Sequence, residues 1–261
     1  MTQGTSDKKQ EAGSLVTKQS GALATLDFVQ DSGMGLENID REHRSMPFLK
    51  LLQSGSYETK KKHAKYVEGA EAGMLYNTVT GKLYSGEKGI EVIPVFFNMT
   101  YPEWAPFERS EGRPVHNDRG PGIMVKTTQN EQNKDMLENG NQIIKTANHY
   151  VIILGDRPDR ALITMKSTQL KESRNWNSLM ENEFEIDPKT KKAVPAPIFS
   201  RIYKLNSVEN SGSFSWHGYK VSLARKVDNA ALYQMARDFH NSLKTSLKKA
   251  TESVGENKSN Y

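Results

Sequence analysis

The sequence predicts a mainly β domain of the α+β class: a small Greek-key β-barrel with one inserted helix and a C-terminal helix. Three observations lead to this prediction. Runs of β-branched and aromatic residues, bounded by turn residues, recur between residues 74 and 227. One helical pattern, at 169–180, lies between them, and a second follows Asp228. Roughly five to seven strands with one helix between them suit a barrel of this type.

The first 45 residues are predicted to be a mobile arm. They are rich in Gly, Ser, Thr and Gln and have weak periodicity, with a short helix expected at most near Leu23–Phe28. Four carboxylates form an acidic patch in this arm, at Asp27, Asp31, Glu37 and Asp40. A single domain is then expected over 46–250, followed by a disordered tail at 251–261.

The domain is predicted to begin with a short helix at Met46–Leu52, because Pro47 suits a first helical turn and Gly55 a stop. The basic run Lys60–Lys65 is interpreted as solvated surface, the usual place for such a run. Met74–Tyr84 predicts a β-hairpin that turns at Thr80 and Gly81.

The middle of the domain is predicted to consist of strands and one long loop. Gly89–Met99 has a strong strand pattern, in which Pro94 indicates an edge position or a bulge. A polar, glycine-containing stretch at about 105–130 predicts a long loop. Two further strands are expected at 149–154 and 161–165, joined by a turn.

The last third alternates helix, loop, strands and helix. Ser167 and Thr168 are expected to cap the helix at 169–180, and a Pro- and Lys-rich loop follows at 185–197. Two strands are predicted within Ile198–Val227. Asp228 then caps a final helix, whose apolar positions are Leu232, Met235, Phe239, Leu243 and Leu247.

Composition narrows the function classes. Of the 261 residues 36% are hydrophobic, and the net charge is +5, which permits binding to a polyanion without requiring it. The absence of cysteine excludes disulfides, thiolate metal sites and a Cys nucleophile. The N-terminus lacks the apolar core of a secretory signal, and no apolar run is long enough to span a bilayer. An intracellular protein that does not contact membranes is therefore expected.

The most informative stretch is Ile198–Val227, where aromatic and basic residues are interleaved along two strands. It holds five Arg and Lys residues and one acid, Glu209. A sheet of this composition can stack unpaired bases and follow a phosphate backbone. The alternative is an ordinary half-buried strand pair, with aromatics inside and lysines outside.

The sequence thus predicts a nucleic-acid site made of stacking rings and phosphate-binding cations. Phe214 and Trp216 share a strand face, and Tyr219 joins them only if a bulge occurs at Gly218. Trp104 and Trp176 are interpreted as core anchors. The predicted site residues are Tyr203, Lys204, Phe214, Trp216, Tyr219, Lys220, Arg225, Lys166, Lys171 and Arg174.

Signatures of catalysis are missing, so no catalytic residue, cofactor or metal is expected. Gly81-Lys82 lacks the first glycine and the hydroxyl residue of a phosphate-binding loop. Pro158-Asp159 with Lys166 resembles part of a nuclease motif, but Thr164 stands where a second carboxylate is required. The six histidines have no ligand spacing.

Several blocks resemble those of tailed-bacteriophage proteins. Ser167–Met180 and Asn77–Gly81, with Ile90–Trp104 behind them, are similar to blocks of uncharacterised and replication-associated phage proteins. Trp216–Leu223 is similar to the closing strands of phage OB-fold proteins that bind single-stranded DNA. The resemblance covers about residues 46–227.

This resemblance implies an OB-like fold and a protein that coats single-stranded DNA in the host cytoplasm during replication or recombination. Implied partners are a phage polymerase, helicase or recombinase, and a second copy of the chain. The C-terminus is not acidic, unlike the partner-recruiting tails of many such proteins, although the acidic patch in the arm could serve that purpose. Two alternatives stay open: a phage virion or assembly protein, and a metal-dependent nuclease or annealing enzyme.

Overall fold

The computed structural model describes residues 30–39, 44–110, 112–212 and 215–256. The chain divides into two compact units, Met1–Ser45 and Met46–Tyr261. In the first unit, residues 30–39 form turns and are exposed, whereas the predicted short helix near Leu23–Phe28 lies outside the described residues. The second unit is mainly β with two α-helices, as the sequence predicts.

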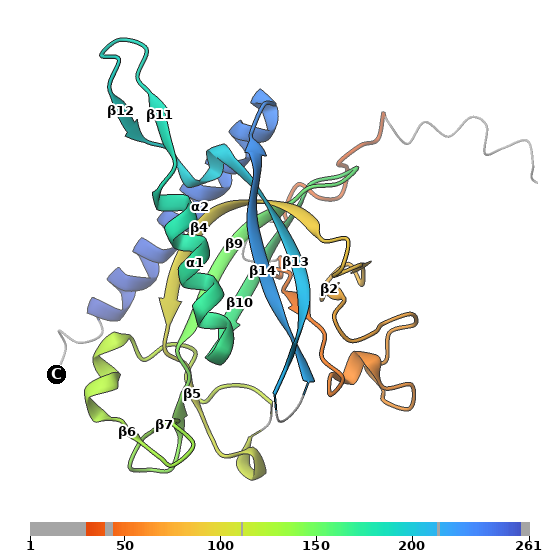
Figure 1. Cartoon of the computed structure of the whole chain (residues 1–261), viewed down its shortest axis with the longest axis vertical. Coiled ribbons are helices and arrows are strands. Elements are labelled where there is room, and N and C mark those ends of the chain that lie inside the picture. Colours follow the sequence, from red (N-terminus) through yellow and green to blue (C-terminus); the bar gives the residue numbers. More distant parts are fainter. Residues whose placement is uncertain (1–29, 40–43, 111, 213–214, 257–261) are drawn as a thin grey trace, which may run out of the picture. The chain divides into compact units, whose positions relative to one another are not determined.

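A five-stranded antiparallel sheet forms the centre of the second unit, in the order β10-β9-β4-β13-β14 (Figure 1). Its strands are β4 (Ile90–Thr100), β9 (Thr146–Ile153), β10 (Asp159–Lys166), β13 (Arg201–Ser211) and β14 (Ser215–Lys226). The pairing of β4 with β9 shifts register between Pro94 and Phe96. Pro94 has no N–H to donate, so the predicted bulge is confirmed, on a central strand.

A second sheet, β1-β2-β3, contains a correction to the sequence analysis. Its strands are β1 (Leu49–Leu51), β2 (Leu75–Asn77) and β3 (Leu83–Tyr84). The hairpin predicted at Met74–Tyr84 is confirmed, but the helix predicted at Met46–Leu52 is wrong. Leu49 pairs with Asn77 and is buried while Lys50 is exposed, an alternation that satisfies a strand. Pairing with a distant segment has overridden the local helix signal.

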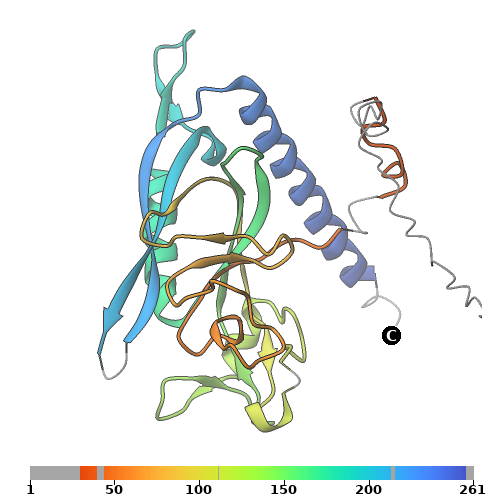
Figure 2. The same cartoon turned by 90° about the vertical axis from the view of Figure 1, so that its right-hand side faces the viewer.

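An apolar cluster lies on each face of the central sheet. Consecutive residues of β4 point to opposite sides, so Val92 belongs to one apolar cluster and Ile93 to the other. Helix α1 (Leu170–Glu181) packs on the first side through Trp176. Helix α2 (Ala230–Glu256) packs on the second through Phe239 (Figure 2). Helix α2 extends into the end of the chain that was predicted to be disordered.

The described sheets are open, so the closed barrel expected from the sequence is not formed by the strands described here. The region predicted as one loop at about 105–130 contains two 3-10 helices, η4 (Phe107–Arg109) and η5 (Pro121–Lys126). A small sheet, β5-β8-β7-β6, adjoins it. Its strands are β5 (Glu103–Trp104), β6 (Thr128–Gln129), β7 (Asp135–Met136) and β8 (Gln142–Ile143).

The stretch predicted as a loop at 185–197 is instead a two-stranded ribbon. Its strands are β11 (Phe184–Ile186) and β12 (Ala193–Pro195). Three short 3-10 segments complete the second unit: η3 (Tyr57–Thr59), η6 (Ser167–Gln169) and η7 (Ile198–Ser200). Ser167 and Thr168 thus form the turn that leads into α1, and no side-chain hydrogen bond caps either η6 or α1.

Candidate functional site

Two of the predicted stacking rings are core residues. Tyr203 is fully buried, and burial raises the pKa of its hydroxyl to about 12. Tyr219 is 5% exposed, and its hydroxyl donates a 2.9 Å hydrogen bond to the carbonyl oxygen of Leu49. Burial also raises the pKa of Tyr219. Neither ring can stack on a base, because α1 and the small sheet that begins with β1 pack against this side of the central sheet.

Trp216 points to the other face of β14. The pairing of β13 with β14 runs without a shift from Tyr203–Leu223 to Ser211–Ser215, so no bulge occurs at Gly218. Trp216 and Tyr219 therefore lie on opposite faces. Trp216 is half-buried, and Phe214 lies outside the described residues.

The predicted cations fall into separate groups. Lys204 and Lys220 are exposed on the face of Trp216, away from the face that α1 covers. Arg225 is paired with Glu91 at 2.6 Å. The remaining cations lie elsewhere: Lys171 and Arg174 are exposed on α1, and Lys166 ends β10. The structure therefore does not gather the ten predicted residues into one surface.

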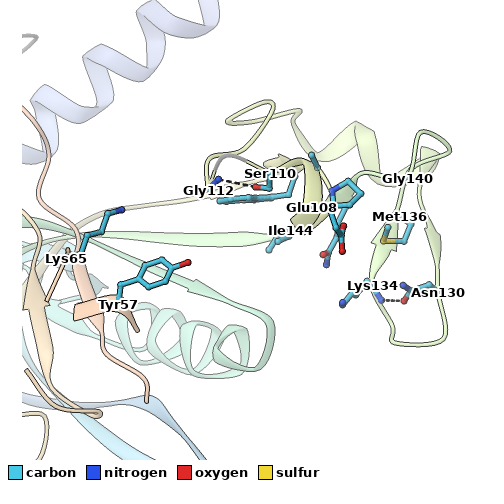
Figure 3. A pocket seen from close by; sticks show the side chains of 14 residues that line it. Tyr57, Lys65, Glu108, Ser110, Gly112, Asn130, Lys134, Met136, Gly140 and Ile144 are labelled. Carbon is cyan, nitrogen blue, oxygen red and sulfur yellow. Dashed lines mark hydrogen bonds between the residues drawn. The ribbon is translucent and has the colours of Figure 1, made fainter. Parts of the chain in front are cut away.

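A cavity of about 840 Å³ lies at a different place in the same unit. Tyr57 and Lys65 line one side, and Figure 3 shows them across the space from Glu108, Lys134 and Met136. Trp104 also lines the cavity and is half-buried, so its predicted role as a core anchor is corrected. Trp176, by contrast, is fully buried as predicted.

Tyr57 is held outward by the turn that carries it. Its neighbour Glu58 is buried and accepts a hydrogen bond from Lys50. Burial alone would raise the pKa of Glu58, but the bond and charge of Lys50 outweigh it, so the pKa lies below its usual value. The loop closes where Leu52 bonds to Met74 and Gly73 through backbone groups. This anchoring leaves the ring of Tyr57 48% exposed.

The ring of Tyr57 has an aromatic and cationic environment. It stacks on His63 at 4.2 Å between centroids, with 9° between the planes. The ammonium groups of Lys60 and Lys65 lie 5.6 and 5.9 Å from its centroid. Cations at this distance interact favourably with the ring and add positive charge beside it.

Trp104 is positioned by its neighbour on the opposite strand face. Glu103 is 1% exposed and accepts 2.6 Å hydrogen bonds from Arg119 and Asn141. Burial raises the pKa of Glu103, but these bonds and the charge of Arg119 outweigh burial and lower it. Because neighbouring strand residues point apart, anchoring Glu103 turns Trp104 towards the cavity. The ammonium group of Lys166 lies 5.7 Å from the centroid of Trp104.

The cavity can therefore receive a flat ring and an anion. Lys65 and Lys134 are among its lining residues, and Glu108 is the one carboxylate among the lining residues that the structure describes. Lys60 and Lys166 add charge at the two rings. No group of three or more His, Asp or Glu residues that could hold a metal ion occurs in the described ranges.

Of the residues at this site, Lys166 is among the ten predicted from the sequence. The two aromatic residues, Tyr57 and Trp104, are not. The sequence interpretation of the basic run at Lys60–Lys65 is solvated surface, and the sequence makes no prediction for Tyr57. An aromatic residue three positions before a lysine run is the signal that could have identified this surface.

A family model described as Pam3 phage gp34-like protein matches residues 16–249, which is most of the chain. Neither the curated proteins nor the solved structures include a match. Within the described part of the chain, no helix has the length and apolarity needed to cross a membrane.

Proposed function

The chain belongs to the Pam3 phage gp34-like family, and on this premise we propose that it binds single-stranded DNA at the cavity between Tyr57 and Trp104. One observation carries the proposal: each of the two rings at this cavity has at least one lysine ammonium group beside it, two at Tyr57 and one at Trp104. Rings that stack on bases and cations that follow phosphates are the two elements of single-strand recognition.

The expected energetics follow from these groups. Each base that stacks on an aromatic ring contributes about 1–3 kcal/mol and does so for any sequence. In this proposal four lysines, at 60, 65, 134 and 166, neutralise phosphates. For single strands each phosphate contact contributes about −0.7 to the slope of log affinity against log salt, so a slope of about −3 is expected.

In this proposal the protein coats DNA and performs no catalysis. It acts in the host cytoplasm during phage replication or recombination, beside a polymerase, helicase or recombinase. An OB-like relationship is part of the proposal. It is supported by the one described α-helix between β10 and β13, which is α1, and by the non-sequential strand order, although the described sheets are open.

The experiment is a fluorescence anisotropy titration of labelled oligo-dT with the full chain. Tyr57→Ala and Trp104→Ala should each weaken binding by about 5- to 150-fold, the equivalent of 1–3 kcal/mol. Tyr57→Phe is the matched control, because it keeps the ring, and it should bind like the parent protein.

Absence of binding at low salt would refute the proposal, and so would parental affinity in the Tyr57→Ala, Trp104→Ala double variant. Adding magnesium to the same reaction tests the nuclease alternative, which requires cleavage of the oligonucleotide.

A second candidate function, assembly of a phage particle, is favoured by one observation. Phe184 and Ile186 are 52% and 62% exposed on the ribbon β11–β12. A contiguous apolar patch on the surface can mark a site of contact with another protein.

A further inference from the structure

The ribbon β11–β12 projects from the rest of the second unit (Figures 1 and 2). Its register pairs Phe184 with Pro195, Glu185 with Val194, and Ile186 with Ala193. Paired residues share a face, so Phe184, Ile186, Ala193 and Pro195 lie on one side of the ribbon. Glu185 and Val194 lie on the other.

Ion pairs fix which side of the ribbon faces the domain. Glu185 contacts Arg201 at 2.6 Å and Lys226 at 2.9 Å. Arg201 is 2% exposed and also donates to the carbonyl oxygen of Phe184. The face of Glu185 is therefore held against the sheet, and the apolar face of Phe184 and Ile186 points to solvent.

The outward face of the ribbon is apolar, and the turn that joins its two strands is positively charged. All four of its residues are exposed. The turn beyond them carries Lys189, Lys191 and Lys192. The one acidic residue of this turn, Asp187, accepts hydrogen bonds from the backbone N–H of Lys189 and the hydroxyl of Thr190. This face therefore suits an occupant with apolar side chains and uncompensated carboxylates.

The same chain contains a segment of this chemistry. Residues 22–39 include seven large apolar residues and three carboxylates, and they contain no lysine or arginine. In the described part of this segment, Met34 and Leu36 are 68% and 57% exposed. We infer that the outward face of the ribbon β11–β12 binds residues 22–39 of a second copy of this chain.

Such a contact is heterologous, because the ribbon and the acidic segment are different surfaces. Each copy can donate its segment to one neighbour and accept a segment from another, so copies can join into an open chain. If the proposed function holds, this chain would coat DNA with copies in series. The contact itself requires no DNA and is tested without it.

The experiment measures binding of a fluorescent peptide of residues 22–39 to the full chain, together with sedimentation velocity of the protein alone. The double variant Phe184→Ser, Ile186→Ser should bind the peptide at least about tenfold more weakly and should self-associate less. Val125→Ser is the matched control, because Val125 is 88% exposed on η5, outside the ribbon.

A charge exchange makes the test specific. The variant Lys189→Glu, Lys191→Glu should reject the parental peptide and accept a peptide that carries Asp31→Lys and Glu37→Lys. Equal peptide binding by the ribbon variants and the parent would overturn the inference. If the ribbon variants self-associate less than the parent but the parent does not bind the peptide, residues 22–39 are not the segment that the ribbon binds, and the inference is overturned.

One further outcome distinguishes a nucleic-acid role for the ribbon. If the ribbon variants lose oligo-dT affinity while parental self-association persists, the ribbon contacts DNA and the inference is overturned. If Tyr57→Ala and Trp104→Ala lose oligo-dT affinity while they still bind the peptide, the DNA site and the ribbon contact are separate, and both proposals are supported.

Discussion

At the scale of single residues, His149 combines complete burial with a titratable ring. Its Nε2 lies 2.8 Å from the hydroxyl of Ser173, and its ring stacks on Trp176 at 4.5 Å. Burial lowers the pKa of His149 to about 3. The folded protein therefore keeps this ring neutral at pH values where the unfolded chain would protonate it.

This difference predicts a loss of stability in mild acid. The unfolded chain binds a proton below about pH 6.5 and the folded protein does not, so the free energy of unfolding falls as the pH falls. Between about pH 7.5 and pH 5 the loss should be roughly 2 kcal/mol. Urea denaturation at both pH values measures it.

The control is His149→Gln, which cannot titrate and keeps a polar group beside Ser173. Its free energy of unfolding should change less over the same window. The pKa values of Glu58 and Glu103 are lowered, so their contributions are lost only in more acidic solution. A His149→Gln variant with the parental pH dependence would contradict the assignment.

Residue patterns alone could not separate the ring that lines the cavity from the rings that pack in the core. Tyr203, Tyr219 and Tyr57 all stand near basic residues in the sequence. Strand alternation gives each tyrosine of the β13–β14 pair one of two faces, but which face is covered depends on where α1 and β1 pack. That information lies in contacts between distant segments, which local patterns do not contain.

At the scale of elements, the loop between Leu52 and Gly73 depends on a close backbone approach. A Cβ at Gly86 would lie 1.8 Å from the carbonyl oxygen of Gly73, so Gly86→Ala must displace one of the two segments. Overpacking of this kind costs about 1–3 kcal/mol. The variant should unfold at lower urea concentration and should bind oligo-dT more weakly.

Gly55→Ala is the matched substitution for this prediction. Gly55 lies in the loop between Leu52 and Gly73, and a Cβ at this position would meet no atom within 4 Å. Its stability and oligonucleotide affinity should equal those of the parent. If Gly86→Ala and Gly55→Ala changed stability and oligo-dT affinity equally, the close approach of Gly86 to Gly73 would not be what positions the loop.

Elements with strong local patterns were predictable from the sequence, and elements created by distant pairing were not. The helix at 169–180, the hairpin at Met74–Tyr84 and the bulge at Pro94 follow from periodicity, turn residues and the missing N–H of proline. Strand β1 and the ribbon β11–β12 do not. Strand β1 and both strands of the ribbon are only 3 residues long, so none of them is long enough to show a strand pattern of its own.

At the scale of the whole molecule, two basic surfaces are candidates for the proposed DNA site. One is the cavity with Lys65 and Lys134, and the other is the outer face of β13 and β14 with Lys204 and Lys220. Reversing the charges of the cavity pair should lower oligo-dT affinity and reduce the salt slope to about half. Anisotropy titrations over a salt series measure both quantities.

The double variant Lys204→Glu, Lys220→Glu is the counterpart, with the same change of net charge. It should retain the parental salt slope if the cavity is the binding surface. A larger loss in this variant than in Lys65→Glu, Lys134→Glu would return the site to the strand pair that the sequence suggested.

The backbone bonds that join Leu52 to Met74 and Gly73 also have an evolutionary consequence. The segment that carries Tyr57 leaves the sheet β1-β2-β3 after Leu52 and returns to it at Gly73, so its two ends lie together as in an Ω-loop. Insertions and deletions in such a segment leave the sheet register unchanged, because the entropy of loop closure grows only slowly with length. An exchange of this segment for one of different length would therefore be compatible with an unchanged scaffold, and the cavity could change while the sheets stay the same.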